Sequence, residues 1–266
     1  EIFSQLWMQI NSSFESREVI RSSHSDFSSN QFLDNKINSK TATVTFTGIN
    51  YTKIEKNDIA YFVEARVSKA SIIEQLIEDI KNSNHKAQSL LAKLQYQDSL
   101  IWWLESRDFS SEVDKLLVRQ AMLKSLSVDH IPPATQVDKL VRKISEVHSS
   151  ILIYLIPSRN NIKSAQLLAD QLSSQRIKTT FRNTDSVSQT LNLKTDLRQS
   201  IIGDAYISTQ ITTIKLQGKN GNTLASNEII STGNSLSNYL LSKEGAERNF
   251  NTIINDQGLW ESLGLK

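Results

Sequence analysis

The segment NDIAYFVEARVSKASIIEQLIEDI, residues 57–80, constrains the fold most, because a strand pattern passes into a helix pattern with no loop between them. Within 59–67 every second residue is apolar or aromatic, which is the period of a strand with one buried face. From Ile72 onward the apolar residues recur every three or four positions, as in an amphipathic helix that Ser68 or Ser71 can cap. The segment therefore predicts a helix folded back onto a sheet.

A second strand pattern precedes this segment. In TATVTFTG, residues 41–48, Ala42, Val44 and Phe46 alternate with threonines, which makes this the clearest strand in the sequence. The turn EKND, residues 55–58, then returns the chain toward the next strand. Together the two patterns predict a β-hairpin covered by a helix.

Between about residue 83 and residue 148 the apolar spacing is helical only. Three apolar stripes are separated by SRDFSSE, residues 106–112, and by HIPPATQ, residues 130–136. Because the proline pair stops a helix, we place a domain boundary there. Residues 1–130 are predicted to form a sheet-and-helix core with a helical extension, and residues 131–266 a second domain.

Strand and helix patterns alternate after this boundary. The long hairpin pattern, residues 204–231, turns on Asn220-Gly221, a dipeptide that suits tight hairpin turns. The other expected elements are a strand over 151–156, a helix over 162–172, a strand over 177–181 and a closing helix over about 234–255. The second domain is therefore predicted to be an α/β layer domain, and the chain as a whole belongs to the α+β class.

Charge and composition exclude two broad classes. Lys and Arg number 30 against 28 Asp and Glu, with no run of either sign, so the sequence lacks the basic footprint of a nucleic-acid binder. Its longest apolar stretch, residues 149–156, is far shorter than a membrane-spanning helix of about 20 residues. The sequence contains no cysteine, which fits an oxidising compartment. It starts at Glu1 rather than Met, so we expect an upstream segment, such as a signal peptide or lipid anchor.

No catalytic or cofactor motif stands out. The chain lacks a G-x-S-x-G nucleophile elbow and both glycine-rich phosphate-binding patterns. Its four histidines, His24, His85, His130 and His148, do not fall in metal-ligand spacing. We therefore predict no catalytic residue, no cofactor and no metal site, and an enzyme of an unrecognised class is the weakest hypothesis.

Two groups of residues are candidates for ligand contact. Trp102 and Trp103 could stack on a glycan ring, although adjacent helical positions point about 100° apart, so packing in a helical core is favoured. Arg176, Lys178 and Arg182 fall on one face of the strand pattern RIKTTF and could bind an anionic partner. The alternative is a solvated strand face whose charges prevent edge pairing.

The order of the segments resembles a bacterial envelope family. YFVEARVSKA, preceded by FTGINYTKIEKND and by WMQINSSFES, resembles the core of the LPP-twenty lipoproteins, which are similar to parts of flagellar assembly proteins P and T. In longer members helices like residues 89–123 follow, then a proline break and an α/β domain. There LRQSIIGDAYISTQ and NGNTLASNEIISTGNSLSNYLLSKEGAERNFNTI resemble the strand pair and closing helix. In the family this strand more often ends in Leu-Ala-Val followed by an Asp-Arg or Asn-Arg pair, whereas this chain has EARVSK, residues 64–69. If the basic residue of that pair orders the corner between strand and helix, Lys69 would have that role here.

The resemblance implies an exported, non-enzymatic protein, anchored in the outer membrane by a lipidated N-terminal cysteine that lies outside this sequence. It implies a role in envelope structure or assembly, with other envelope proteins or a second copy of the chain as partners, and membrane contact through the lipid alone. It carries over no catalytic residue. The alternative is a periplasmic binding module for cell-wall glycan or peptide, which would use Trp102, Trp103 or the basic strand.

Overall fold

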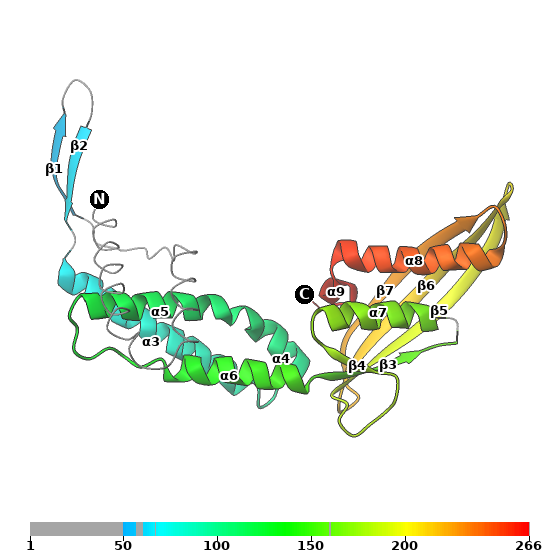
Figure 1. Ribbon diagram of the computed structural model, residues 1–266, viewed down its shortest axis with the longest axis horizontal. Coiled ribbons are helices and arrows are strands. Elements are labelled where there is room, and N and C mark those ends of the chain that lie inside the picture. Colours follow the sequence, from blue (N-terminus) through cyan, green and yellow to red (C-terminus); the bar gives the residue numbers. More distant parts are fainter. Residues whose placement is uncertain (1–49, 57–60, 67, 160, 266) are drawn as a thin grey trace, which may run out of the picture. The chain divides into compact units, whose positions relative to one another are not determined.

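A computed structural model describes residues 50–56, 61–66, 68–159 and 161–265 (Figure 1). The chain divides into two compact units. The helical unit includes Glu105–Ile144 and the described residues up to Gln95, and the sheet unit comprises Tyr96–Leu104 and the chain from Ser145 onward. The boundary expected after residue 130 falls in the loop before the helix Thr135–Ser150, whereas the two units divide within that helix, after Ile144.

The described part of the helical unit begins with a β-hairpin whose first strand lies after residues 41–48, and Glu55 and Lys56 of the expected turn belong to that strand. Strand β1, Asn50–Lys56, pairs antiparallel with β2, Tyr61–Arg66, and helix α3, Lys69–Lys93, follows almost at once. The Ser68 hydroxyl accepts a hydrogen bond from the Ser71 N–H at 3.4 Å, so Ser68 is the N-cap. The direct passage from strand to helix is thus confirmed, whereas the strand expected over 41–48 lies outside the described residues. The expectation that this helix folds back over the hairpin is wrong for the described residues, because α3 packs on α5, Ser110–Ser125, rather than on β1 or β2.

Helix α3 is longer than expected, because it continues through residue 83 to Lys93. Its buried residues follow one another at spacings of three or four, so they form a single stripe along one face: Ile72, Leu76, Ile80, Ser83 and Ala87. The next helices are α4, Ser99–Ser106, the short η1, Arg107–Phe109, and α5, Ser110–Ser125, then α6, Thr135–Ser150. The three apolar stripes found between about residues 83 and 148 therefore correspond, in order, to the C-terminal part of α3 together with α4, to α5, and to α6.

A mixed five-stranded sheet forms the sheet unit, in the order β4-β3-β5-β6-β7. Strand β3, Leu152–Pro157, is parallel to both β4, Lys178–Thr180, and β5, Gln189–Ile202. The longer strands β5, β6, Ala205–Gly218, and β7, Thr223–Ser235, form an antiparallel meander. These findings confirm the strands expected over 151–156 and 177–181 and the hairpin over 204–231. In the hairpin turn Gly221 has a positive φ of 78°, which glycine adopts readily.

The apolar pattern did not predict strand β5, although it is central to the sheet, and only the resemblance at LRQSII, residues 197–202, implied a strand in its second half. Its apolar residues Leu191, Leu193 and Leu197 do alternate with polar ones, but Thr195 interrupts the pattern on the buried face. The expected closing helix also starts later than predicted. Helix α8 spans Tyr239–Gln257, because β7 continues as a strand through Ser235.

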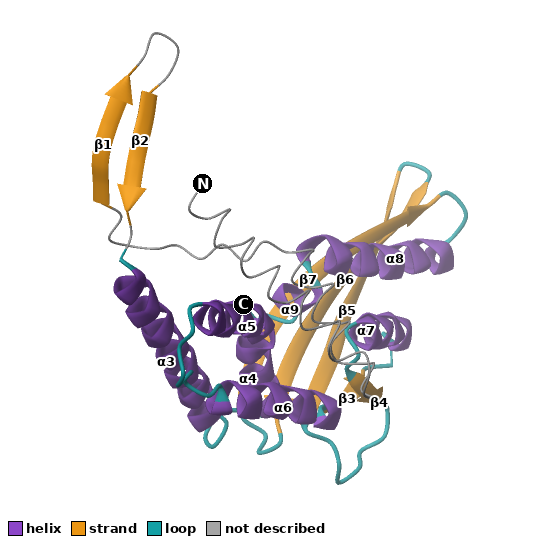
Figure 2. Cartoon of the chain, turned by 60° about the vertical axis from the view of Figure 1, so that its left-hand side comes forward, coloured by secondary structure: helices purple, strands orange, loops and turns teal. Residues whose placement is uncertain are grey.

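Helices α7, Ile162–Ser174, and α8 lie on the same face of the sheet, which we call the covered face (Figures 1 and 2). The short helix α9, Leu259–Ser262, follows α8. One end of the covered face is apolar and fully buried, with Leu191, Leu193, Ile214 and Leu216 among its residues. Further along the strands the same face becomes polar, because Thr195, Ser208, Gln210, Thr212 and Ser231 replace the aliphatic residues.

Hydrogen bonds satisfy part of this polar region. The Thr195 and Thr212 hydroxyls lie 2.9 Å apart, and the Asn161 amide donates to Thr195 Oγ1 at 2.9 Å. The Ser208 hydroxyl lies 2.7 Å from that of Ser242 on α8. Because buried polar groups are costly when unpaired, the Ser208–Ser242 bond favours one position of α8 on the sheet, and the Asn161 bond does the same for the start of α7.

Candidate interaction surface

Neither tryptophan proposed for ligand stacking is available to a ligand. Trp102 is 0% exposed and Trp103 is 7% exposed. The Trp103 ring stacks on His148 with centroids 4.7 Å apart and an interplanar angle of 13°, and its centroid lies 5.8 Å from that of Trp260 in an edge-on contact. Both positions fit the alternative reading of the sequence, in which the two tryptophans pack in the core.

The three basic residues do not share a strand face, and the expectation that they do is wrong. Only Lys178 lies in β4, which ends at Thr180, so Arg182 follows the strand. Arg176 lies before it with φ of 59°, and its N–H donates to Ser173 O in the turn that ends α7. The alternation in RIKTTF, residues 176–181, did not predict this, because the segment contains both the turn that ends α7 and the three-residue strand β4.

The positive charge of Lys178 has a structural role at the end of α6. Its ammonium donates a hydrogen bond to the Ser149 carbonyl oxygen at 2.8 Å, in the last turn of α6. The C-terminal carbonyls of a helix carry partial negative charge, so a cation is stabilising there. Lys178 therefore caps α6, while all three basic residues keep exposed surface.

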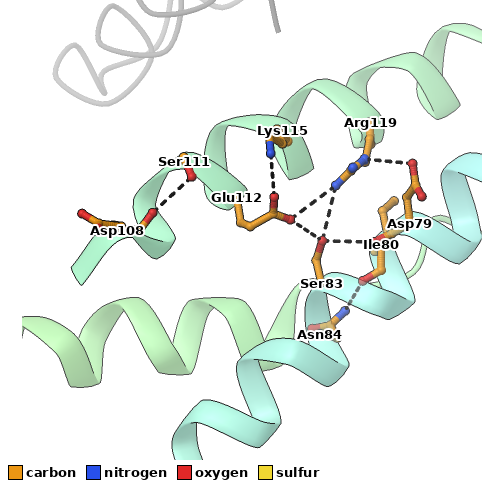
Figure 3. Close-up of polar contacts among 9 residues, drawn as sticks. All are labelled: Asp79, Ile80, Ser83, Asn84, Asp108, Ser111, Glu112, Lys115 and Arg119. Atoms are coloured by element: carbon orange, nitrogen blue, oxygen red, sulfur yellow. Dashed lines mark hydrogen bonds and ion pairs between the residues drawn. The ribbon is translucent and has the colours of Figure 1, made fainter. Parts of the chain in front are cut away.

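The helical unit contains a cluster of polar residues between α3 and α5 (Figure 3). Arg119 lies 3.3 Å from Asp79 Oδ2 and 3.8 Å from Glu112 Oε2, and Ser83 donates to Glu112 Oε2 at 3.2 Å. Lys115 donates to the other Glu112 oxygen at 2.9 Å. Because each charge has an opposite charge beside it, the cluster joins the two helices rather than presenting a reactive group.

The pKa of Glu112 reflects these contacts. Partial burial acts to raise the pKa of this carboxyl, but the hydrogen bond and charge of Lys115, with Ser83 and Arg119, lower it below its ordinary value of 4.5. A lowered pKa in the folded chain contributes stability above pH 4.5, which is lost as the pH falls through the folded-state value.

We expect Glu112→Gln to be less stable than the parent at neutral pH and less sensitive to acid. Below pH 4.5 the parent should lose free energy of unfolding with an extra slope of at most about 1.4 kcal/mol per pH unit, the limit for one proton. Urea titrations of the parent and of Glu112→Gln between pH 3 and 7 measure this difference in the free energy of unfolding. The exposed Glu78→Gln on α3 is the control, and an identical pH slope in the parent and Glu112→Gln would contradict the expectation.

Exposed apolar side chains gather at one end of the sheet unit. They come from the end of β5, from the corner between β7 and α8 and from the first turn of α8, and we call them the apolar tip: Ile201, Ile202, Leu236, Leu240 and Leu241. Leu236 is 79% exposed, and Ile202 and Leu240 are each 67% exposed. Several large apolar side chains exposed at one end of a fold can mark a surface that binds another molecule.

Strand pairing and ring packing bring the parts of the tip together. The two-residue turn Gly203-Asp204 joins β5 to β6, and Ile201 pairs with Tyr206, which pairs in turn with Ser235 of β7. The Tyr206 ring meets Tyr239 of α8 edge-on, with centroids 5.0 Å apart. Figure 1 shows the β5–β6 turn and the start of α8 at the same end of the sheet.

The tip is almost free of charge. Asp204 is the single charged residue within 199–207 and 234–242. The sequence patterns did not predict this surface, although they contain one signal for it. The adjacent Ile201 and Ile202 interrupt the alternation just before the Gly203-Asp204 turn. Neighbouring strand residues point to opposite faces, so one of such a pair lies off the core-facing side.

The described ranges contain no candidate for a metal centre or for a membrane-spanning helix. No group of three or more His, Asp or Glu side chains there could hold a metal ion. No helix among those residues is both long and apolar enough to cross a bilayer. The apolar tip is thus the best candidate for a functional surface in the part of the chain that the structure describes.

No protein-family model matches the sequence, and no curated protein matches it either. Membership of the LPP-twenty family therefore stays a prediction. Several solved structures of bacterial lipoproteins are similar to part of the chain. A minor lipoprotein from Acinetobacter baumannii is 11% identical, with a TM-score of 0.32 over 40% of this chain and 88% of that chain. The rare lipoprotein B from Shewanella oneidensis is 14% identical, with a TM-score of 0.30 over 41% and 96%.

A secreted protein from Helicobacter pylori is similar over more of the sequence. It is 10% identical, with a TM-score of 0.46 over 86% of this chain and 87% of that chain. Solved structures similar to the chain thus include bacterial lipoproteins and a secreted protein. Similarities at these TM-scores do not identify the activity or the partners of this chain.

Proposed function

We propose that the protein is a non-enzymatic structural or assembly component of the bacterial cell envelope, which binds another envelope protein through the apolar tip. The observation that carries the proposal is the tip itself, five large apolar side chains that remain exposed beside a single charge. Burying a side chain such as Leu or Ile against a partner contributes about 1.5–3 kcal/mol. Burial of several such side chains can therefore stabilise a specific contact.

The envelope location rests on the sequence. The segment order resembles the LPP-twenty lipoproteins, and the cysteine-free composition fits an oxidising compartment. We propose that the protein resides in the periplasm, anchored to the outer membrane by an N-terminal lipid, and that it belongs to this family and its flagellar-assembly relatives. The glycan-binding alternative has weaker support, because Trp102 and Trp103 are buried and the three basic residues do not share one strand face.

Fractionation of cells that carry the complete gene tests the proposal. The protein should be recovered in the outer-membrane fraction, incorporate a palmitate analogue and migrate within a complex larger than the chain alone. Cytosolic recovery would contradict the envelope role. A soluble periplasmic protein that pulls down with cell wall would favour the binding module instead.

The tip is tested in the same cells with Ile202→Ser combined with Leu240→Ser. Both side chains are exposed, so the free energy of unfolding should change by less than about 0.5 kcal/mol for each site. Loss of the two contacts should weaken the complex by about 100-fold or more. Tyr96→Ser is the matched control, since Tyr96 is an exposed aromatic outside the tip. Equal recovery of the complex with the tip variant would refute the role of the tip.

A further inference from the structure

The two edges of the five-stranded sheet differ in how they are protected. Strand β4 forms one edge and has only three residues, of which Lys178 is charged. Strand β7 forms the other edge with 13 residues, no proline and one charged residue, Glu228. Short length and lysines are the usual devices that keep an edge strand from pairing with another chain. The β4 edge has both, whereas the β7 edge has neither.

The hydrogen bonds indicate which β7 residues face outward. The Glu228 N–H donates to the side chain of Asn227 at 2.9 Å, so it turns away from β6. In an antiparallel strand the direction alternates, so Ile230, Thr232 and Asn234 also direct their N–H and C=O groups outward. The side chains of Thr209 and its partner Thr232 lie 3.2 Å apart, as expected for the closer spacing of a pair without mutual backbone bonds.

The outward groups of β7 are not all equivalent. Near its start, Gly264 of the C-terminal turn approaches the backbone of Ser226, where an added Cβ would lie 2.9 Å from the carbonyl oxygen. The backbone groups of Ile230, Thr232 and Asn234 have no hydrogen bond outside the β6 ladder among the described residues. The segment Ile230–Asn234 is therefore a short, uncharged stretch that can accept a further strand.

We infer that this segment pairs with the same segment of a second copy of the chain, antiparallel and across a two-fold axis at Thr232. Pairing of two outward-facing strands would match Thr232 with Thr232 and Ile230 with Asn234, so each of the three residues would exchange its backbone bonds. The inference rests on the sheet edge and does not depend on the apolar tip. It adds a specific partner, the chain itself, to the proposed function.

Charge favours a second copy over a charged partner strand. The shared segment carries no charge, and with the axis at Thr232 the two Glu228 residues lie at opposite ends of the joint, roughly 25 Å apart at about 3.3 Å per residue. An acidic or basic strand would find no complementary charge in 230–234. Ile230, which is 58% exposed on the uncovered face, would be covered by the neighbouring strand.

A single engineered cysteine tests the register directly, because the chain has no native cysteine. Paired residues that exchange backbone bonds have Cα atoms about 5.5 Å apart, within reach of a disulfide. Full-length Thr232→Cys should therefore form a disulfide-linked dimer under mild oxidation. Thr213→Cys is the control, because Thr213 is exposed on the same face but belongs to the interior strand β6. Equal crosslinking of the two variants would overturn the proposed register.

Thr232→Pro tests the pairing in solution. The Thr232 N–H is not used by the β6 ladder, so proline is tolerated there, while two hydrogen bonds across the axis are lost. Sedimentation should show that the parent chain is a dimer. The dissociation constant of the dimer should rise about tenfold or more in Thr232→Pro and in Thr232→Lys. A monomeric parent, or a dimer that these variants leave unchanged, would overturn the inference. The tip variant Ile202→Ser with Leu240→Ser should still dimerise, so failure of this pairing and failure of the proposed function are distinguishable.

Discussion

Gly233→Val is expected to destabilise the sheet unit by roughly 3 kcal/mol or more, the upper end of the range for overpacking. Helix α8 crosses β7 at Gly233, where an added Cβ would overlap the Ala246 nitrogen and the Ser242 carbonyl oxygen. Both are backbone atoms, so the helix would have to move away from the strand. That movement would also separate the Ser208 and Ser242 hydroxyls, which are buried and 2.7 Å apart.

Gly245→Ala is the matched control for this prediction. Gly245 lies on the α8 side of the same contact, but its added Cβ would lie 3.2 Å from Gly233 Cα and no closer than 3.7 Å to other atoms. Alanine also favours the helix by about 1 kcal/mol over glycine. Urea unfolding followed by far-ultraviolet circular dichroism should give a large loss for Gly233→Val and a change within about 1 kcal/mol for Gly245→Ala. Similar small effects in both variants would mean that α8 does not contact β7 at Gly233.

The elements that the sequence predicted correctly are those with one strong, local signal. The passage from β2 to α3 has a strict change of period and a serine cap, and the β6–β7 hairpin has Asn220-Gly221 at its turn. Periodicity missed strand β5 because its covered face changes from leucine to threonine at Thr195, and only the resemblance implied a strand at residues 197–202. That threonine pairs with Thr212 and Asn161, which are distant in sequence, so tertiary contacts rather than local pattern keep the strand buried.

The candidate surface was less predictable than the fold. Exposure of Ile202 and Leu240 depends on where β5 ends and where α8 begins, and the expected start of α8 at about 234 placed that corner inside a helix. The basic residues failed for a related reason, because an alternating pattern does not reveal that Arg176 closes α7 in a left-handed turn. Periodicity predicts which face of an element is buried but not where the element stops.

Trp102→Ala is expected to cost about 3–5 kcal/mol of unfolding free energy, the range for removing a buried aromatic side chain. Trp102 has no exposed surface and belongs to α4, in the part of this helix that is assigned to the sheet unit. Alanine would leave a cavity that the surrounding side chains can fill only partly. Trp102→Phe should lose less, because it keeps much of the ring volume. Tyr96→Ala, whose side chain is 78% exposed, should change stability by less than about 0.5 kcal/mol.

Cell-wall pulldown and urea unfolding of Trp102→Ala and Trp103→Ala separate packing from ligand contact. A stacking platform holds its rings in solvent, so its loss would weaken binding to isolated cell wall while leaving the unfolding midpoint unchanged. Trp103 lies between His148 and Trp260, and its removal should lower the midpoint instead. If Trp103→Ala kept its midpoint and lost cell-wall binding, the ring would have to be accessible, and the glycan-binding alternative would replace the envelope assembly role. If it lost stability alone, both tryptophans would be core residues, and partner contacts would depend on the apolar tip and the β7 edge.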